Sequence, residues 1–411
     1  RQTAYQVLVA SDPSKLVPGK ADVWDSGKVV SAESQNVRYG GPTPVARQRA
    51  YFTVRVWDET DRPTAFASPS WWEMGLYDEE WEGQWVGRPS RGSAEADRSV
   101  AYLRKSFQLP KGIRRARLYA SAFGVYEMRL SGRRVGDAVL APGYTDYEKR
   151  VLFQTYDVTG LVRAGDNVLA AIVGGGWCTA ALGGRAGVCG TEPPRVMAQL
   201  EVTLADGSLV KVITDESWRA HTGPIVSSHL YDGESYDARL ETPGWDGPTF
   251  DDGAWDLAQA YDKKKERDLV ADPGPPIEVG APIAAVSARR SPGGGTVFDF
   301  GQNVVGRVRL AVNVPAATTL VLRHAEALAS DGSLDVGSLR GAKATDRYVA
   351  RGGRVSWEPS FAVHGFRYVE VTGAPAALPL TGVVALPVHA RMPRGGAVET
   401  SNSQLNALVA N

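Results

Sequence analysis

Short alternating stretches separated by turn residues fill almost the whole chain, and they constrain its fold more than any other feature. In residues 50–64 (AYFTVRVWDETDRPT), the apolar side chains of Phe52, Val54 and Val56 alternate with polar ones before a polar turn. A period of two is typical of a β-strand with one buried face. The pattern recurs in residues 100–110, 114–136, 195–214 and 306–328.

Two further observations fix the fold class. The dipeptide Asp206-Gly207 separates two alternating runs and predicts the tip of a β-hairpin. Long helical periodicity is lacking until the last ten residues. We therefore expect an all-β chain of consecutive antiparallel β-sandwiches.

Changes in composition mark the domain boundaries. The tryptophan-rich run of residues 71–85 interrupts the strand pattern, and residues 261–280 are first charged and then rich in proline. Both stretches are typical of connections between domains. We expect three β-domains followed by an incipient helix, with boundaries at residues 1–78, 79–262, 263–394 and 395–411.

Both ends of the chain look like interrupted elements. Residues 3–10 already alternate as a strand, so we expect that a first strand precedes them. The last residues, SNSQLNALVAN, predict a helix with Ser401 as N-cap and Gln404 as its capping-box partner. About two turns remain, and isolated helices shorter than about 12 residues are marginal in water. This helix must either dock on the body of the protein or open a further domain.

The charge balance argues against two classes of partner. Lysine and arginine total 46, aspartate and glutamate also total 46, and the net charge is zero. Such a surface lacks the basic footprint of proteins that bind nucleic acid or anionic membranes. The longest uncharged run, residues 167–184, contains five glycines, which favours a buried strand and a loop over a membrane helix. We expect neither a nucleic-acid partner nor a membrane.

The two cysteines, Cys178 and Cys189, flank this glycine-rich loop. They are either unrelated thiols or a disulfide, which would stabilise the fold by about 3 kcal/mol in the chain-entropy model. A bridge would indicate a periplasmic or secreted protein, whereas free thiols would indicate a cytoplasmic one.

The densest group of carboxylates lies in residues 230–258. Asp232 and Glu234 are two positions apart, so on a strand they share a face with their Cα atoms about 6.6 Å apart. Glycoside hydrolases use carboxyl groups about 5–9.5 Å apart as acid and nucleophile or base. The neighbouring Asp-Gly and Pro-Gly pairs indicate turns, and structural hydrogen bonding is the reading that they favour.

Aromatic and oxygen-bearing side chains suggest a sugar or calcium site. Trp177, Trp245 and Trp255 lie in glycine-rich or polar loops, where an indole either stacks on a sugar face or closes the end of a sandwich. Hard oxygen donors that suit calcium occur in turn-like contexts, at Asp146, Asp157, Asp166 and Asn167, without EF-hand spacing.

Other catalytic systems find no support in the sequence. A G-x-S-x-G nucleophile elbow, an H-E-x-x-H pair and a phosphate-binding loop are all missing. The histidines are scattered, at His221, His229, His324, His364 and His389.

Several stretches occur in an order that resembles a known family. They include YQVLVAS, VLAPGYTDYEKRVLFQTYDVTG, YDGESYDARLETPGW, FDFGQNVVGRVRL, LRHAEAL and FAVHGFRYVEVTG. Together they resemble the front half of the bacterial α-L-rhamnosidases of glycoside hydrolase family 78. The resemblance implies a fibronectin-type-III-like domain, a jelly-roll that binds rhamnose through calcium in some members, and a second β-sandwich.

In that family an (α/α)6 barrel follows and carries the chemistry, an inverting hydrolysis of terminal α-L-rhamnose with a glutamate as general acid. The resemblance therefore implies that the catalytic carboxylates lie outside these residues, that hydrolysis requires no cofactor, and that residues 395–411 open the barrel. The expected partners are a rhamnose-containing glycoside or polysaccharide and the barrel of the same polypeptide.

The stretch GYTDYEKR is the neighbourhood that the resemblance assigns to the rhamnose site. We expect Asp146, Tyr147 and Trp177 to contact carbohydrate, with Asp146 as a calcium ligand, although Tyr147 replaces the asparagine of the family's Asp-Asn pair. Two alternatives remain open: a carbohydrate-binding module that acts alone without hydrolysis, and a structural adhesin-like array.

Overall fold

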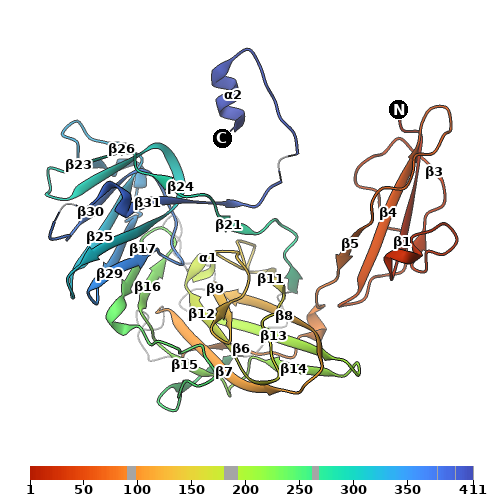
Figure 1. The fold of residues 1–411 in the computed structure, drawn as a ribbon, viewed down its shortest axis with the longest axis horizontal. Helices are drawn as coiled ribbons and strands as arrows, with labels where there is room; N and C mark the ends of the chain where they lie inside the picture. Colours follow the sequence, from red (N-terminus) through yellow and green to blue (C-terminus); the bar gives the residue numbers. More distant parts are fainter. Residues whose placement is uncertain (90–98, 180–192, 262–267, 377, 394, 411) are drawn as a thin grey trace. The chain divides into compact units, whose positions relative to one another are not determined.

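A computed structural model describes residues 1–89, 99–179, 193–261, 268–376, 378–393 and 395–410. It divides into two compact units, Arg1–Trp81 and Glu82–Asn411, and the division falls within the tryptophan-rich run of residues 71–85. Nearly all the regular structure is β, as expected (Figure 1). Among the described residues, no helix has the length and apolar character needed to span a membrane.

The first unit is built on one antiparallel sheet with the order β2-β1-β4-β5, in which β3 also pairs with β1. Leu8 and Ala10 pack with Leu16 on one face, against Tyr51 and Phe66. The strands are β1 (Ala4–Ala10), β2 (Trp24–Asp25), β3 (Val29–Val30), β4 (Arg49–Trp57) and β5 (Ser70–Glu73).

The second unit begins with a jelly-roll of two sheets, whose core includes Leu103, Leu118, Met128 and the fully buried Trp218. The first sheet has the order β10-β9-β12-β7-β15-β18. Its strands are β7 (Ala101–Leu109), β9 (Val125–Leu130), β10 (Arg133–Arg134), β12 (Gly165–Gly174), β15 (Arg219–His221) and β18 (Asp256–Leu257).

The other jelly-roll sheet has the order β19-β6-β13-β8-β11-β20, with β14 paired to β13. The predicted hairpin is confirmed, because β13 and β14 pair in antiparallel fashion on either side of Asp206-Gly207. Gly207 has a φ of 86°, which favours glycine. The strands are β6 (Trp85–Gly87), β8 (Ile113–Phe123), β11 (Arg150–Asp157), β13 (Arg195–Leu204), β14 (Leu209–Ile213), β19 (Gln259–Tyr261) and β20 (Asp268–Ala271).

The remaining large sheet has the order β16-β17-β28-β25-β30-β24-β31-β21, with β22, β23 and β29 paired to it. Its longest strand, β24 (Thr296–Val314), changes register between Asp299 and Val304 and so serves several partners. The other strands are β16 (Ile225–His229), β17 (Gly233–Asp237), β21 (Ile277–Val279), β22 (Ile283–Ala284), β23 (Ser287–Arg290), β25 (Thr319–Ala325), β28 (Thr345–Val349), β29 (Gly353–Trp357), β30 (His364–Thr372) and β31 (Val383–Ala390), with β26 (Ala327–Leu328) and β27 (Leu334–Asp335) forming a separate pair.

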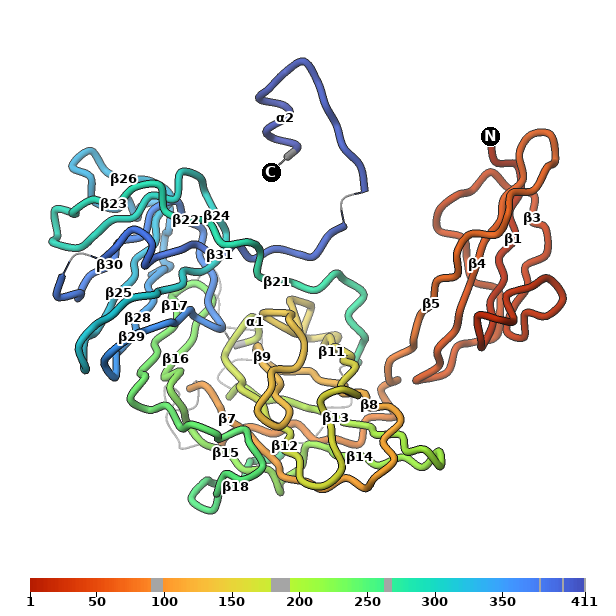
Figure 2. Tube along the Cα trace, viewed as in Figure 1, coloured from red at the N-terminus to blue at the C-terminus, as the bar shows by residue number. Residues whose placement is uncertain are grey.

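Within the part of the chain that the structure describes, two strand pairings cross the predicted boundary at residue 262, and both are parallel. The strand β17 lies before that boundary but pairs with β28 of the last sandwich. The strand β20 lies after it but pairs with β11 of the jelly-roll. Figure 2 shows the chain passing through β16 and β17 (green) beside the cyan and blue strands. The two sandwiches are therefore interlocked.

The predicted terminal helix exists as α2 (Ser403–Ala410), but its cap differs from the prediction. The Asn402 side-chain oxygen accepts hydrogen bonds from the backbone N–H groups of Gln404 (3.0 Å) and Leu405 (3.2 Å). Asn402 directly precedes the first helical residue, which is the N-cap position, so the assignment of Ser401 was wrong by one residue. The apolar side chains of Leu408 and Val409 are exposed.

Candidate functional site

The residues predicted to bind carbohydrate lie on two segments of the jelly-roll. Asp146 and Tyr147 belong to the loop between β10 and β11, and Trp177 lies on the short helix α1 (Gly176–Thr179). Tyr144, which the sequence analysis did not single out, connects them. Its ring centroid lies 6.3 Å from that of Tyr147 and 5.9 Å from that of Trp177, and the residue is 65% exposed.

Tyr147 does not present a face to a ligand, because it is fully buried and its hydroxyl donates to the Gly143 carbonyl (2.7 Å). The expectation that Tyr147 touches sugar therefore needs correction: Tyr147 supports the loop, and the exposed ring is that of Tyr144. Asp146 is exposed, accepts a hydrogen bond from the Glu148 N–H (3.2 Å) and lies 3.3 Å from Lys149 Nζ.

The other predicted calcium donors make hydrogen bonds within the protein. Asp157 accepts a hydrogen bond from the Thr159 hydroxyl (2.7 Å), and Asp166 accepts one from Gln108 (3.0 Å). Asn167 is buried and donates to the Arg163 carbonyl (2.7 Å). These contacts give each side chain a structural role, and a calcium site at these residues stays a prediction.

Two further predictions can be placed. Cys178 is buried and disulfide-bonded, but Cys189 lies outside the described residues, so the Cys178–Cys189 bridge stays a prediction. Trp245 and Trp255 stack on each other with ring centroids 6.1 Å apart, and Trp255 is buried in a hydrophobic cluster. Their contact with each other and the burial of Trp255 favour a structural role for both indoles.

The carboxylates of Asp232 and Glu234 have structural partners. Asp232 pairs with Lys343 Nζ (3.0 Å), whereas Glu234 is buried and accepts hydrogen bonds from the backbone N–H groups of Ser360 and Phe361 (both 2.9 Å). Burial raises the pKa of Glu234 to about 8, although these two N–H groups act in the opposite direction. The structural interpretation of this pair is supported.

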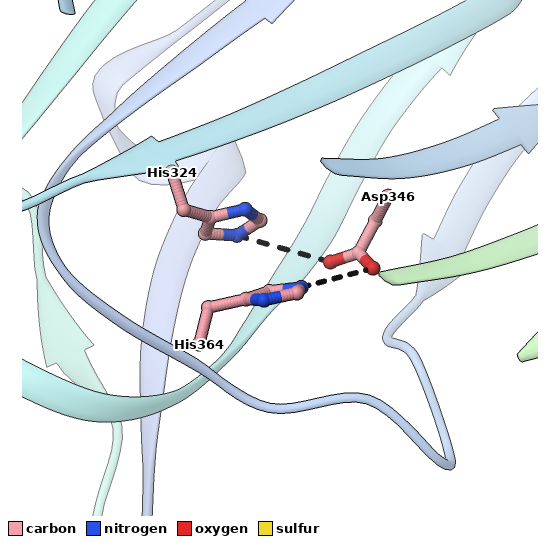
Figure 3. Close-up of side chains that lie close together, drawn as sticks. All are labelled: His324, Asp346 and His364. Atoms are coloured by element: carbon pink, nitrogen blue, oxygen red, sulfur yellow. Dashed lines mark hydrogen bonds and ion pairs between the residues drawn. The ribbon is translucent and has the colours of Figure 1, made fainter. Parts of the chain in front are cut away.

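A cluster that the sequence analysis did not assemble lies inside the last sandwich and is formed by His324, Asp346 and His364 (Figure 3). Its residues come from the adjacent strands β25, β28 and β30. On β25, Leu320 and Leu322 face the core, and alternation carries His324 to the same face. Asp346 is paired in register with Leu322. All three cluster residues are buried.

Polar contacts connect the three side chains of this cluster to one another and to the backbone. His324 Nδ1 lies 3.0 Å from the Ala344 carbonyl oxygen. Asp346 Oδ1 accepts the Glu234 N–H (2.8 Å) and lies 3.2 Å from His364 Nε2. The rings of His324 and His364 are inclined to each other by 34°, with their centroids 4.3 Å apart. In Figure 3 the two rings lie one above the other and both approach the carboxylate.

Burial is the main influence on the pKa of His324. It lowers the pKa of His324 to about 3, and the neighbouring His364 adds to the effect, so His324 is neutral at physiological pH. Burial also acts to raise the pKa of Asp346, but His364, His324 and the hydrogen bond from the Glu234 N–H together hold the pKa of Asp346 below its usual value. The cluster thus combines a carboxylate with a neutral imidazole in the sandwich interior.

A polar cavity of about 140 Å³ lies between β9 and β24 and is lined partly by four charged side chains. Arg307 Nη2 pairs with Glu358 Oε1 (2.6 Å), and Arg134 Nε lies 3.3 Å from Glu127 Oε2. Since these charges are balanced within the cavity wall, the cavity has no net charge to attract an ionic ligand.

Three family models match the chain in the order of its domains. They are a Rha78A-like N-terminal immunoglobulin domain over residues 1–78, an α-L-rhamnosidase N-terminal domain over residues 111–281, and a bacterial α-L-rhamnosidase concanavalin-like domain over residues 289–389. The chain belongs to the bacterial α-L-rhamnosidases. The first domain of this rhamnosidase chain matches an immunoglobulin model where a fibronectin-type-III-like one was expected; both are β-sandwiches.

Two known α-L-rhamnosidases align with the whole chain. The enzyme of Streptomyces avermitilis is 33% identical to it, and the alignment spans all of this chain and 56% of the relative. The enzyme of Formosa agariphila is 37% identical, and the alignment spans all of this chain and 45% of the relative. The crystal structure of the Streptomyces avermitilis enzyme complexed with L-rhamnose superposes with a TM-score of 0.91 at 32% identity, covering 100% of this chain and 56% of that one. The chain thus spans about half the length of these relatives.

Proposed function

We propose that this chain is the non-catalytic front of an α-L-rhamnosidase, which hydrolyses terminal α-L-rhamnose from glycosides or polysaccharides with inversion. The observation that carries the proposal is the ordered match of three rhamnosidase domains along one chain. The whole chain superposes on a rhamnosidase whose crystal structure contains L-rhamnose, which supports rhamnose as the sugar that is recognised.

We infer that the described residues do not cleave the glycosidic bond, and the surroundings of their most acidic stretch support this inference. An inverting glycosidase needs an acid and a base about 6.5–9.5 Å apart on either side of an accessible sugar. In the most acidic stretch, Glu234 is enclosed by backbone donors and Asp232 is held by Lys343. We therefore assign bond cleavage to an (α/α)6 barrel of the same polypeptide, without a required cofactor.

For the jelly-roll we propose a carbohydrate subsite on the surface formed by Tyr144, Asp146 and Trp177. The exposed ring of Tyr144 offers a flat apolar face, and the Asp146 carboxylate is an exposed oxygen donor for sugar hydroxyls or for calcium. The buried ring of Tyr147 supports the ring of Tyr144 through an edge-to-face contact.

Hydrolysis of p-nitrophenyl α-L-rhamnoside tests the assignment of chemistry. The 411-residue chain should release no p-nitrophenol, whereas the complete gene product should release it. Turnover by the chain alone would contradict the proposal.

Calorimetry with L-rhamnose tests the subsite. Binding to the chain should weaken at least about tenfold in Tyr144→Ala, because stacking on an aromatic face is lost. Tyr231→Ala, which removes another exposed tyrosine, should leave binding unchanged. EDTA should weaken binding if calcium takes part, and equal affinity of all these proteins would contradict the subsite.

A further inference from the structure

We propose that His324, Asp346 and His364 form a binding site for a divalent transition-metal ion, with Zn²⁺ as the ion that their chemistry fits best. Nothing in the proposed hydrolysis of rhamnose uses these residues. They lie inside the last sandwich and are held by three adjacent strands, β25, β28 and β30.

The first support is that two buried hydrogen-bond acceptors, one on His324 and one on Asp346, face each other. A carbonyl oxygen only accepts hydrogen bonds, so the contact of His324 Nδ1 with Ala344 O (3.0 Å) places the ring proton on Nδ1. His324 Nε2 then presents a lone pair, and it faces Asp346 Oδ2 at 3.8 Å. Neither atom has a hydrogen-bond partner among the described residues, and both residues are fully buried. Two acceptors facing each other repel unless a cation lies between them.

The distance between these acceptors suits a metal ion. A direct hydrogen bond needs a separation of about 3.2 Å or less, which 3.8 Å exceeds. Zinc bonds to imidazole nitrogen and carboxylate oxygen are each about 2.0–2.2 Å long, so one ion slightly off the line between the atoms reaches both. His364 supplies a third ligand, and the ligand atoms of the three side chains all lie within 4.8 Å of one another.

The surroundings resemble those of metal ligands. Histidines that bind metal usually donate their other ring N–H to a carbonyl or carboxylate, as His324 does to Ala344, and the second oxygen of Asp346 is held by the Glu234 N–H (2.8 Å). Two imidazoles and one carboxylate match zinc and its neighbours in the first transition row. Calcium and magnesium prefer sites made entirely of oxygen.

Metal retention by the purified 411-residue chain tests the proposal. The chain is stripped with EDTA, incubated with ZnCl₂, passed over a desalting column and analysed by mass spectrometry for zinc. We expect one zinc per chain in the wild type and in His389→Gln, which removes an exposed histidine of the same sandwich. In His324→Gln and Asp346→Asn, zinc affinity should fall by about tenfold or more.

Two measurements on the wild type keep the test valid if the variants fail to fold. Zinc should raise the melting temperature of the stripped chain, because an ion that binds only the folded state stabilises it. Co²⁺ should give the visible absorption bands of a nitrogen- and oxygen-ligated site, and zinc should abolish them. A wild type that retains no zinc, or a folded His324→Gln that binds zinc as tightly as wild type, would overturn the proposal.

Discussion

At the scale of single residues, buried charges are held by specific partners. Arg307 is almost completely buried on β24, and its guanidinium donates to Glu358 (2.6 Å). Glu358 also accepts a hydrogen bond from Arg309 (2.6 Å). One glutamate thus balances two arginines at the edge of the polar cavity, and its removal leaves the buried cation uncompensated.

We expect Glu358→Gln to lower the free energy of unfolding by about 2 kcal/mol. Breaking a fully buried ion pair costs about 3–5 kcal/mol, and partial exposure of Glu358 reduces that cost. Urea denaturation followed by circular dichroism measures the change. The exposed Glu326→Gln of the same sandwich should change stability by less than about 0.5 kcal/mol, and an equal effect of both substitutions would argue against the pairing.

The pair of Asp299 and Arg367 predicts a dependence on pH. The guanidinium of Arg367 binds both carboxylate oxygens (2.8 and 3.0 Å) and lowers the pKa of Asp299. Since the folded state then binds fewer protons than the unfolded state, this stabilisation is complete above the unfolded pKa of about 3.9 and is lost as pH falls through the lower folded pKa.

Denaturation curves of wild type and Arg367→Gln between pH 3 and pH 6 check this expectation. The wild type should be the more stable protein at the upper end of this range, and the difference in the free energy of unfolding should shrink on acidification. Arg354→Gln, which alters an exposed arginine of β29, is the matched control. A difference that stays constant with pH would refute the role of Asp299.

At the scale of elements, helix α2 shows how a single cap sets a boundary. Its eight residues are fewer than an isolated helix needs for stability in water, and the two hydrogen bonds to Asn402 satisfy backbone N–H groups of its first turn. Ser401, which the capping-box spacing suggested as the N-cap, lies one residue before the N-cap position.

We expect Asn402→Ala to destabilise α2 by about 1 kcal/mol and to speed amide hydrogen exchange across residues 403–410. Ser401→Ala should leave exchange there unchanged. Hydrogen-exchange mass spectrometry of the terminal peptide distinguishes the two variants. Faster exchange in Ser401→Ala would restore the assignment made from sequence.

At the scale of the whole molecule, the sandwiches of the second unit share strands. β17 forms part of the last sandwich, and Glu234 on that strand accepts the backbone N–H groups of Ser360 and Phe361. The boundary that composition suggests near residue 262 therefore separates β17 from the strand and the backbone N–H groups to which it is hydrogen-bonded.

We expect a fragment of residues 263–411 to lack cooperative unfolding, because it loses β16, β17 and the carboxylate of Glu234. A fragment of residues 82–411 keeps these elements and should unfold cooperatively. Thermal unfolding monitored by circular dichroism compares the two fragments. A cooperative transition in the shorter fragment would show that β17 is dispensable.

The sequence predicts local features of this molecule well and long-range ones poorly. Alternation identified β4 and the Asp206-Gly207 hairpin because both depend on neighbouring residues. The parallel pairing of β17 with β28 left no local signal. His324 and His364 seemed scattered because sheet order alone brings them together, although the place of His324 after Leu320 and Leu322 on a core-facing strand was a visible hint.

The pairing of β17 with β28 also bears on how the protein is made. During synthesis, Glu234 leaves the ribosome 112 positions ahead of Asp346, to which its amide is bonded in the finished fold. Contacts between residues this distant slow folding, and an unpaired strand edge that waits for its partner is prone to aggregate. The nascent chain therefore passes through a vulnerable interval, in which chaperones that shield strand edges would raise its yield.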